Sequence, residues 1–286
     1  MINVRFKIYQ NIDLNMILSG KELAKEIQKN LNMPKNACLA IVSVGNDPAS
    51  EIYIGMKIKM AEKVGAKSKV VKLPETITEE KLINEIEKLN NDDSVDGIIV
   101  QIPIPKHISV INTLSSIKSE KDVDGLHPEN VGLLVTNEPR FIPATPKGII
   151  ALLKHYNIQM EGKHAVIVGR SQIVGKPMFN LLLNENATIT MCHSKTIDLE
   201  KYTKQADILI VATGIPNLIT KDMVKENSNI ITVGIARVNG KAVGDCDFDS
   251  IKEIANITPV PGGVGPLTVI MLMENVALAA RMKGKK

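Results

Sequence analysis

Short apolar runs that alternate with helical segments constrain the fold of this chain more than any other feature. In the first half, the apolar runs at residues 37–44 and 97–101 fit strands that are covered on both faces. Helical patterns at residues 20–31, 49–64 and 78–89 flank or separate them. Strands that alternate with helices predict a parallel sheet with right-handed crossovers, so we expect an α/β fold.

The regular alternation stops between residues 103 and 146, where six prolines interrupt the chain. We place a domain boundary near residues 140–145, which divides the chain into residues 1–143 and 144–266. The second half resumes with strand-type runs typical of a compact nucleotide-binding α/β unit. These runs lie at residues 165–168, 188–191, 208–211, 230–233 and 257–260, and a long apolar helix follows at 267–282.

Composition excludes several classes of function. The net charge of +4 comes mostly from scattered lysines, without a basic run that interleaves aromatic residues, so we do not expect a nucleic-acid partner. An anionic small molecule fits the charge better. The three cysteines are widely separated and form neither a disulfide framework nor a C-x-x-C site. The five histidines never lie four residues apart, so we expect no metal site.

The expected location of the protein is the cytoplasm. No uninterrupted apolar run reaches about 18 residues, so we expect no membrane span. Residues 1–15 are too polar for a secretory signal.

A glycine-containing turn follows the first strand of the second half. Gly169 permits a tight turn, and Gly175 opens the next helix, where a pyrophosphate can approach the backbone. The Gly-x5-Gly spacing departs from G-x-G-x-x-G, so a generic strand-to-helix turn stays an alternative. No carboxylate follows the second strand, where Ser194 and Lys195 stand. A carboxylate would repel a 2′-phosphate, whereas these residues and Arg170 can bind one, which favours NADP over NAD.

Tyr53 and Lys57 lie four residues apart in an expected helix and therefore share one face. A partly desolvated lysine has a lowered pKa and can shuttle protons near neutrality. The alternative is a solvated helix face with a tyrosine packed beneath it. Short-chain dehydrogenases also use a Tyr-x-x-x-Lys spacing, but downstream of their glycine turn. Here the pair precedes Gly169, which suggests one domain that holds the substrate and a second that delivers a cofactor.

Three further segments suit a ligand. Gln101 ends an apolar strand, at the edge where α/β sheets bind their ligands, although an amide that faces water is the alternative. Asp122 and Asp124 lie in one short segment, and one of them can simply organise the turn. The loop at residues 259–268 contains three glycines, which let backbone approach a ligand closely.

In their order and spacing, these motifs resemble those of the bifunctional methylenetetrahydrofolate dehydrogenase/methenyltetrahydrofolate cyclohydrolase family. The matches cover the chain from about residue 20 to the C-terminus, and as a set they are specific. They are Tyr53-x-x-x-Lys57, Val100-Gln101-Ile102-Pro103-Ile104-Pro105, Lys121-Asp122-Val123-Asp124-Gly125, Thr145-Pro146-Lys147-Gly148, Gly169-Arg170-Ser171-x-x-Val174-Gly175-x-Pro177, Cys192-His193-Ser194-Lys195-Thr196 and Pro261-Gly262-Gly263-Val264-Gly265-Pro266.

The resemblance implies a fold and an activity. The fold is an N-terminal α/β catalytic domain and a C-terminal Rossmann-like NADP-binding domain with a folate cleft between them. The helix at residues 267–286 is expected to return to the first domain, and the nucleotide domain to form a homodimer. The activity is NADP-dependent oxidation of methylenetetrahydrofolate to methenyltetrahydrofolate, followed by hydrolysis to formyltetrahydrofolate, a step of one-carbon metabolism that serves purine biosynthesis.

The resemblance also assigns roles to matching residues. The catalytic residues would be Lys57, Gln101 and Tyr53. Lys57 would be the general acid/base of the cyclohydrolase step, Gln101 would orient it, and Tyr53 would also pack against the folate. Asp124 would anchor the pterin, whose ring N–H and amino group suit a carboxylate. The residues that would line the substrate and nicotinamide site are Pro261, Gly262 and Gly263. The residues that would bind NADP are Gly169, Arg170, Ser171, Gly175, Ser194 and Ile235, with Arg170 and Ser194 at the 2′-phosphate.

Two positions depart from the family pattern. The family begins a few residues before a Gly-Lys pair such as Gly20-Lys21, so residues 1–15 are extra and Met16 is a plausible start. Thr232 stands where the family commonly has an acid, a change that can weaken a hydrogen bond near the cofactor. Two other hypotheses stay open, a monofunctional dehydrogenase and a non-catalytic NADP-binding module. Retention of Lys57 and Gln101 argues against the first, and the second leaves the motifs of the first half unexplained.

Overall fold

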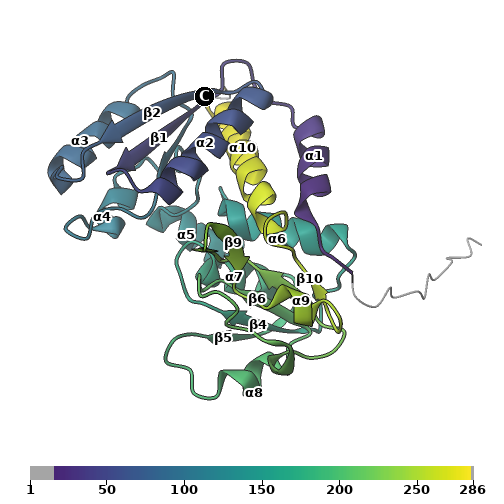
Figure 1. Cartoon of the computed structure of the whole chain (residues 1–286). Helices are drawn as coiled ribbons and strands as arrows, with labels where there is room; N and C mark the ends of the chain where they lie inside the picture. Colours follow the sequence, from purple (N-terminus) through teal and green to yellow (C-terminus); the bar gives the residue numbers. More distant parts are fainter. Residues whose placement is uncertain (1–15, 285–286) are drawn as a thin grey trace, which may run out of the picture.

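The computed structural model describes residues 16–284 and contains two α/β units (Figure 1), which confirms the predicted fold class. The expectation about residues 1–15 lies outside the described residues. The first unit is built on a parallel sheet in the order β2-β1-β3. Its strands are β1 (Cys38–Val44), β2 (Lys67–Leu73) and β3 (Gly97–Val100). Every residue of β1 and β3 is buried, which explains the continuous apolar runs there.

The three helices predicted for the first unit are present. They are α1 (Gly20–Asn30), α2 (Pro48–Lys63) and α3 (Glu79–Asn90). The side chain of Asp47 accepts from the backbone N–H of Ser50 at the start of α2, and Thr78 accepts from that of Lys81 at the start of α3. Ser19 occupies the N-cap of α1, but its side chain makes no capping hydrogen bond.

The proline-rich segment contains two helices that the sequence did not predict. They are α4 (Val110–Ser115) and α5 (Pro128–Val135). Both are too short to show a helical period, and only the residues where they begin indicate a helix. Ser109 caps α4 by accepting from the backbone N–H of Asn112, and Pro128 occupies the first turn of α5.

The second unit is built on a five-stranded parallel sheet in the order β10-β7-β6-β4-β5. Its strands are β4 (His164–Val168), β5 (Thr188–Cys192), β6 (Ile208–Val211), β7 (Asn229–Thr232) and β10 (Asn256–Ile257). The strand predicted at 257–260 ends at Ile257, because Pro259 and Pro261 have no N–H to donate to a ladder. The strand order reverses between β4 and β6, and such a point forms the ligand crevice of doubly wound folds.

The remaining short elements surround the second sheet. They are α6 (Ala144–His155), α7 (Gly175–Asn184), α8 (Leu199–Thr203), η1 (Lys221–Met223), α9 (Phe248–Ile251) and the antiparallel hairpin of β8 (Ile235–Val238) and β9 (Lys241–Gly244). The sequence analysis missed the hairpin. Its turn is formed by Asn239 and Gly240, both with positive φ, which is the usual signal for a two-residue hairpin.

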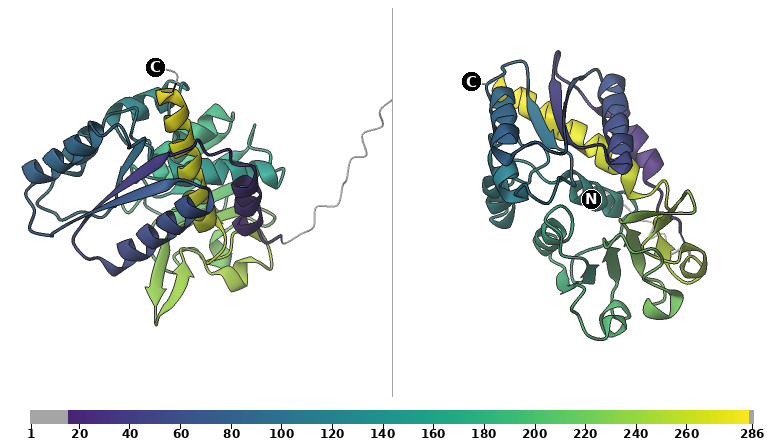
Figure 2. Two further views of the ribbon diagram at one scale, coloured as in Figure 1. Left: turned by 90° about the horizontal axis from the view of Figure 1, so that it is seen from above. Right: turned by 60° about the vertical axis from the view of Figure 1, so that its left-hand side comes forward.

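The last helix, α10 (Val264–Lys283), starts beside the second sheet and contacts α1, α2 and α6 as well as β1 and β3 (Figures 1 and 2). Among the described residues it is the one helix that is long and apolar enough to cross a membrane by length and composition. Of its most apolar window, 61% is buried inside the protein, so packing between the other helices accounts for its apolar surface.

Candidate active site

Lys57 and Gln101 form the centre of the candidate site. Lys57 projects from the third turn of α2, and Gln101 directly follows β3, where its backbone N–H donates to Val42 in β1. The Nζ atom of Lys57 donates to Oε1 of Gln101 over 2.9 Å. The amide nitrogen of Gln101 donates to the carbonyl oxygen of Ile102, also over 2.9 Å. The amide therefore presents its oxygen to the lysine, and neither side chain is simply solvated.

Tyr53 lies one turn before Lys57 on α2, and its side chain is 37% exposed. Ile52 and Met56, also on α2, are exposed large apolar side chains as well, whereas Ile54 on the inner face is buried. An exposed apolar stripe beside a lysine offers a surface on which a flat aromatic ring system can pack.

Asp124 acts on Lys57 through its charge. Burial lowers the pKa of Lys57, and the negative charge of Asp124 partly raises it again. Burial likewise raises the pKa of Asp124, and the positive charge of Lys57 opposes this effect. The site therefore disfavours the charged form of both groups, which brings the lysine closer to the neutral amine that can accept a proton.

Asp122 is the acid that organises the turn. It is buried, and its Oδ2 accepts from the backbone N–H of His127 over 2.7 Å and from Nδ2 of Asn130 over 2.8 Å. Its Oδ1 has no hydrogen-bond partner among the described residues. Burial raises the pKa of Asp122 to about 6, although the hydrogen bonds from Asn130 and His127 oppose this shift. Asn130, which the sequence analysis did not single out, is anchored in turn by a 2.9 Å hydrogen bond from Arg140.

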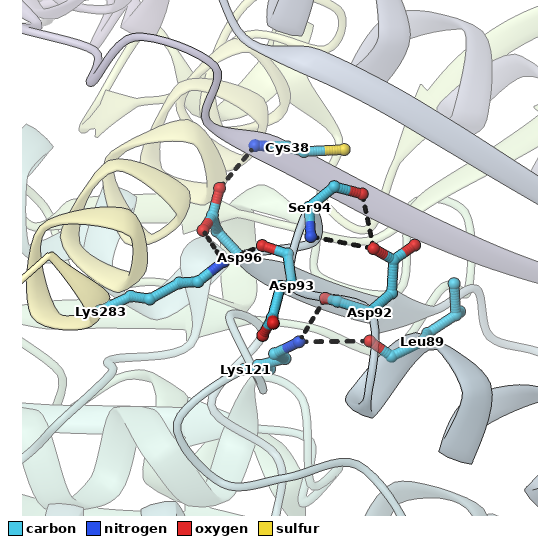
Figure 3. Close-up of polar contacts among 8 residues, drawn as sticks. All are labelled: Cys38, Leu89, Asp92, Asp93, Ser94, Asp96, Lys121 and Lys283. Carbon is cyan, nitrogen blue, oxygen red and sulfur yellow. Dashed lines mark hydrogen bonds and ion pairs between the residues drawn. The ribbon is translucent and has the colours of Figure 1, made fainter. Parts of the chain in front are cut away.

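Lys121, at the start of the same segment, has a structural role at the amino edge of the first sheet, opposite the edge where Gln101 lies (Figure 3). Residues 121–124 run parallel to β3, since Ile98 pairs with Asp122. The Nζ atom of Lys121 donates to the carbonyl oxygens of Leu89 and Asp92, which closes the loop between α3 and β3. The parallel path places Lys121 at the amino edge of the sheet and directs Asp124 toward the carboxyl edge, where Gln101 lies.

The glycine turn after β4 is tightly packed. Gly169 has a φ of 126°, and a Cβ atom there would lie 2.5 Å from the carbonyl oxygen of Ala212 in the loop after β6. A Cβ atom at Gly175 would lie 2.2 Å from the carbonyl oxygen of Gly169. The Oγ atom of Ser171 accepts from the backbone N–H groups of Val174 and Gly175 at the start of α7. Both glycines are therefore required for this turn, because neighbouring backbone occupies the space that a side chain would need at either position.

Arg170 and Ser194 extend the same edge of the second sheet. The backbone N–H of Gly169 donates to the carbonyl oxygen of Cys192 over 2.9 Å, which joins the ends of β4 and β5. Both Arg170 and Ser194 are exposed, and residues 169–175 and 193–196 contain no acid. These residues fit a dinucleotide with a phosphate on its ribose, because the donor set is neutral or cationic.

Asp245 is a buried carboxylate that the sequence analysis missed. It accepts from Oγ1 of Thr213 over 2.9 Å and from the backbone N–H of Gly234 over 2.7 Å. Because Thr213 and Gly234 follow β6 and β7, Asp245 joins two loops at the ligand edge of the sheet. Ile235, which begins β8 beside this junction, is 39% exposed. No local pattern in the sequence marks Asp245, since its partners come from distant loops.

Thr232, which departs from the family pattern, is buried and hydrogen-bonded. Its Oγ1 accepts from the backbone N–H of Asp245 over 3.0 Å, and its own N–H donates to Thr258 over 2.9 Å. The threonine therefore supports the position of Asp245 directly. That the change weakens a hydrogen bond near the cofactor stays a prediction.

The loop that contains Pro261, Gly262 and Gly263 lies where the two units meet. The backbone N–H of Gly20, the first residue of α1, donates to the carbonyl oxygen of Gly262. A Cβ atom at Gly20 would lie 2.1 Å from the carbonyl oxygen of Gly263, and Gly262 has a φ of 115°. The loop therefore connects β10, α10 and the start of α1 at close backbone contact.

Apart from the loop at residues 261–263, the predicted residues fall into two groups. Lys57, Gln101 and Asp124 are linked by a hydrogen bond and by their charges, with Tyr53 on the same helix. The residues of the second group follow strands of the second sheet at its ligand edge; they are Gly169, Arg170, Ser171, Gly175, Ser194 and Ile235. Among residues 16–284, no cluster of three or more His, Cys, Asp or Glu side chains is arranged to hold a metal ion.

Comparisons with known proteins agree with this arrangement. A family model described as the catalytic domain of tetrahydrofolate dehydrogenase/cyclohydrolase matches residues 18–124. A second model, described as the NAD(P)-binding domain of tetrahydrofolate dehydrogenase/cyclohydrolase, matches residues 143–284. The chain is 50% identical over 277 residues to a protein of Staphylococcus aureus named "Bifunctional protein FolD", and the match covers 93% of this chain and 97% of that protein.

Solved structures of related enzymes match the chain over nearly its whole length. The bifunctional FolD methylenetetrahydrofolate dehydrogenase/cyclohydrolase of Campylobacter jejuni is 48% identical with a TM-score of 0.89, covering 93% of this chain and 99% of that one. The methylenetetrahydrofolate dehydrogenase-cyclohydrolase of Trypanosoma brucei, solved with NADP cofactor and an inhibitor, is 36% identical with a TM-score of 0.89. That match covers 94% of this chain and 98% of that one.

Proposed function

The chain belongs to the tetrahydrofolate dehydrogenase/cyclohydrolase family, and we propose that Lys57, Gln101 and Asp124 serve both of its reactions at one site. It is a bifunctional enzyme that oxidises methylenetetrahydrofolate with NADP⁺ and hydrolyses the product to formyltetrahydrofolate. The observation that carries the proposal is the 2.9 Å hydrogen bond between Lys57 and Gln101 at the carboxyl edge of the first sheet.

In the dehydrogenase step, the residues of this chain chiefly hold the substrate in place. NADP⁺, when bound, accepts a hydride from the methylene carbon. Asp124 anchors the pterin ring through its carboxylate, Tyr53 packs against the ring, and residues 261–263 line the space between pterin and nicotinamide. Because the two reactants are already held in position, aligning them no longer adds an entropy cost to the reaction step.

In the cyclohydrolase step, Lys57 moves protons. Its neutral amine takes a proton from the water that adds to the methenyl carbon. The resulting ammonium delivers a proton to the ring nitrogen as the carbon–nitrogen bond breaks and the hydroxyl collapses to the formyl group. One proton is released to solvent overall. Burial lowers the pKa of Lys57, which makes the neutral form more accessible near neutral pH.

NADP is the preferred cofactor in this proposal. Arg170 and Ser194 bind the 2′-phosphate, and Gly169, Ser171 and Gly175 hold the pyrophosphate at the start of α7. The absence of an acid from residues 169–175 and 193–196 supports the preference, because a carboxylate there would repel the phosphate.

The proposal extends to assembly and to cellular role. We propose a homodimer formed through the second unit. Two large apolar residues are exposed there, Ile173 just before α7 and Leu183 near its end. Sedimentation velocity of the purified protein would reveal a monomer if this is wrong. We further propose that the enzyme acts in the cytoplasm and that its formyltetrahydrofolate serves purine biosynthesis.

The direct test follows absorbance after the protein is mixed with NADP⁺ and methylenetetrahydrofolate. We expect NADPH to form and methenyltetrahydrofolate to decay faster than it does in buffer. A monofunctional dehydrogenase would form NADPH while methenyltetrahydrofolate decayed at the buffer rate. A non-catalytic NADP-binding module would form no NADPH.

A further inference from the structure

Asn275 is a polar side chain buried in the middle of the apolar helix α10, with only 1% of its surface exposed. Its Nδ2 atom donates to the carbonyl oxygens of Val123 over 2.9 Å and Ile142 over 2.8 Å. Its Oδ1 atom accepts from Nζ of Lys147 over 3.0 Å. Both N–H groups and the oxygen of the amide are therefore used. Burial of an amide costs little folding free energy only when its N–H groups and its oxygen are hydrogen-bonded in this way.

The three partners come from functionally distinct segments. Val123 directly precedes Asp124, the proposed pterin anchor. Ile142 lies in the linker that leads from the first unit into α6, and Lys147 lies at the start of α6. Lys147 is fixed a second time by an ion pair with Glu274 over 3.0 Å. A single side chain on α10 thus connects the turn that carries Asp124 to the linker between the units.

The other side of that turn also contacts the linker. Gly125 has a φ of 69°, and a Cβ atom there would lie 3.0 Å from the carbonyl oxygen of Phe141 and 3.1 Å from the backbone nitrogen of Pro143. Asp124 is therefore held between Val123, which is bonded to Asn275, and Gly125, which packs against the linker backbone. Rotation of this turn would have to break one of the two contacts.

The helix that carries Asn275 is itself anchored at both ends. Near its start, Oγ1 of Thr268 lies 2.9 Å from Oγ1 of Thr145 in α6. At its end, Arg281 donates to the carbonyl oxygen of Asn32 over 3.0 Å, and Lys283 contacts the carbonyl oxygen of Asp93 and the carboxylate of Asp96 (Figure 3). Asn275 therefore projects from a rigid support rather than from a helix that can shift.

We propose that Asn275 is a positioning residue that holds Asp124 at a set distance from the linker and so aligns the pterin with the nicotinamide. This inference rests on the proposed role of Asp124. Hydride transfer requires alignment across the two units, whereas hydrolysis at Lys57 uses the first unit. Loss of Asn275 therefore lowers dehydrogenase turnover more than cyclohydrolase turnover.

The test replaces Asn275 with leucine, which is similar in size but makes no hydrogen bonds. We expect dehydrogenase kcat/KM for methylenetetrahydrofolate to fall about ten- to a hundredfold, with a smaller loss of cyclohydrolase kcat. The KM for NADP⁺ is expected to change by less than about twofold, since Arg170 and Ser194 lie in loops of the second unit, away from Asn275 and its partners. Arg281→Gln, which removes a different anchor of the same helix, serves as the control and is expected to leave the ratio of the two activities unchanged.

A double-mutant cycle with Asp124→Asn decides whether Asn275 acts through Asp124. We expect the effect of Asn275→Leu on dehydrogenase kcat/KM to shrink at least several-fold in the Asp124→Asn background. Losses that multiply independently, or equal losses in both activities, would overturn the proposal while leaving the role of Asp124 intact. If Asp124→Asn alone leaves folate kinetics unchanged, the proposed role of Asp124 fails, and this proposal falls with it.

A milder variant covers the case in which Asn275→Leu does not fold. Asn275→Ser replaces the amide with one smaller hydroxyl, which offers at most one donor in place of two. In this variant we expect the ratio of dehydrogenase to cyclohydrolase activity to lie between that of the wild type and that of Asn275→Leu. A wild-type ratio, measured on protein shown to be folded by its circular dichroism, would contradict the proposal.

Discussion

Lys57 on α2 and Gln101 after β3 meet through a 2.9 Å hydrogen bond, although 44 residues separate them in the chain. The amide oxygen of Gln101 can accept from either the ammonium or the neutral amine. It therefore orients the lysine in both protonation states, whereas a carboxylate at this position would favour the charged form. The neutral partner suits a residue that must both accept and deliver a proton.

The pH dependence of hydrolysis should follow the lysine. Burial lowers the pKa of Lys57 below its ordinary value of 10.5, and the charge of Asp124 raises it in part. The rate of methenyl hydrolysis, after subtraction of the buffer rate, should rise with pH and level off below the pH at which a free lysine titrates. Asp124→Asn removes the negative charge that stabilises the ammonium form of Lys57. The rising part of the pH profile should therefore move to lower pH. An unchanged or alkaline-shifted limb in the kcat/KM profile would contradict the assignment.

Replacement of Gln101 should impair both activities. Gln101→Ala leaves the lysine without its partner and removes an amide from the substrate site, so kcat should fall in both assays. Gln101→Glu preserves the size of the side chain but adds a negative charge beside Lys57, which raises the pKa of the lysine. In Gln101→Glu, the rise of the methenyl hydrolysis rate with pH should therefore move to higher pH. Steady-state kinetics of the two variants at several pH values separate lost geometry from added charge.

Ser194→Asp should reduce the preference for NADP⁺. A charge-assisted phosphate contact contributes roughly 1.5–3 kcal/mol, or about tenfold to over a hundredfold in affinity. The added carboxylate also repels the 2′-phosphate. The kcat/KM for NADP⁺ should fall far more than that for NAD⁺, while Ser194→Asn, a neutral control, should have a smaller effect. Equal kcat/KM for the two cofactors in the unmodified enzyme would refute the proposed preference.

Asp122 should make the protein less stable as pH rises. Burial raises the pKa of Asp122 to about 6 from the ordinary value of 3.8. The folded state therefore binds the proton more tightly than the unfolded state, and this contribution to stability is lost as pH rises through about 6. Between about pH 5 and pH 7.5 the loss amounts to roughly 1 kcal/mol.

Urea unfolding of the wild type and of Asp122→Asn measures this effect. The stability of the variant relative to the wild type should increase over that pH range. Asp249→Asn, which removes an exposed carboxylate, controls for the loss of one negative charge. A difference between the wild type and Asp122→Asn that does not change with pH would show that Asp122 does not titrate in this way.

Periodicity predicted the long elements of both units because their apolar residues face a continuous core. The buried runs of β1 and β4 and the amphipathic helices α1 and α3 carry this signal in their own residues. The predicted pairing of Tyr53 and Lys57 on one helix also follows from local spacing alone.

Features that depend on distant partners could not be predicted. The distinction between Asp122 and Asp124 arises from His127, Asn130 and the neighbouring strand β3, none of which is visible in the spacing of two acids. Asp245 and Asn275 are single polar residues whose partners come from other segments. Their sequence neighbours do not indicate which backbone groups they bind.

Replacement of Lys57 by methionine is the most direct test of the account. Methionine keeps much of the length of the side chain and removes the proton-carrying amine. Cyclohydrolase activity should fall by about 10²–10⁴-fold, as is typical for loss of a general acid/base. Some dehydrogenase activity should survive, because hydride transfer depends chiefly on positioning. Lys59→Met, an exposed lysine on the same helix, is the matched control and should keep both activities.

The decisive measurement is the time course of methenyltetrahydrofolate after Lys57→Met is mixed with NADP⁺ and methylenetetrahydrofolate. We expect NADPH still to form, and methenyltetrahydrofolate to accumulate and decay at the buffer rate. Hydrolysis of methenyltetrahydrofolate at close to the wild-type rate would contradict the role assigned to Lys57.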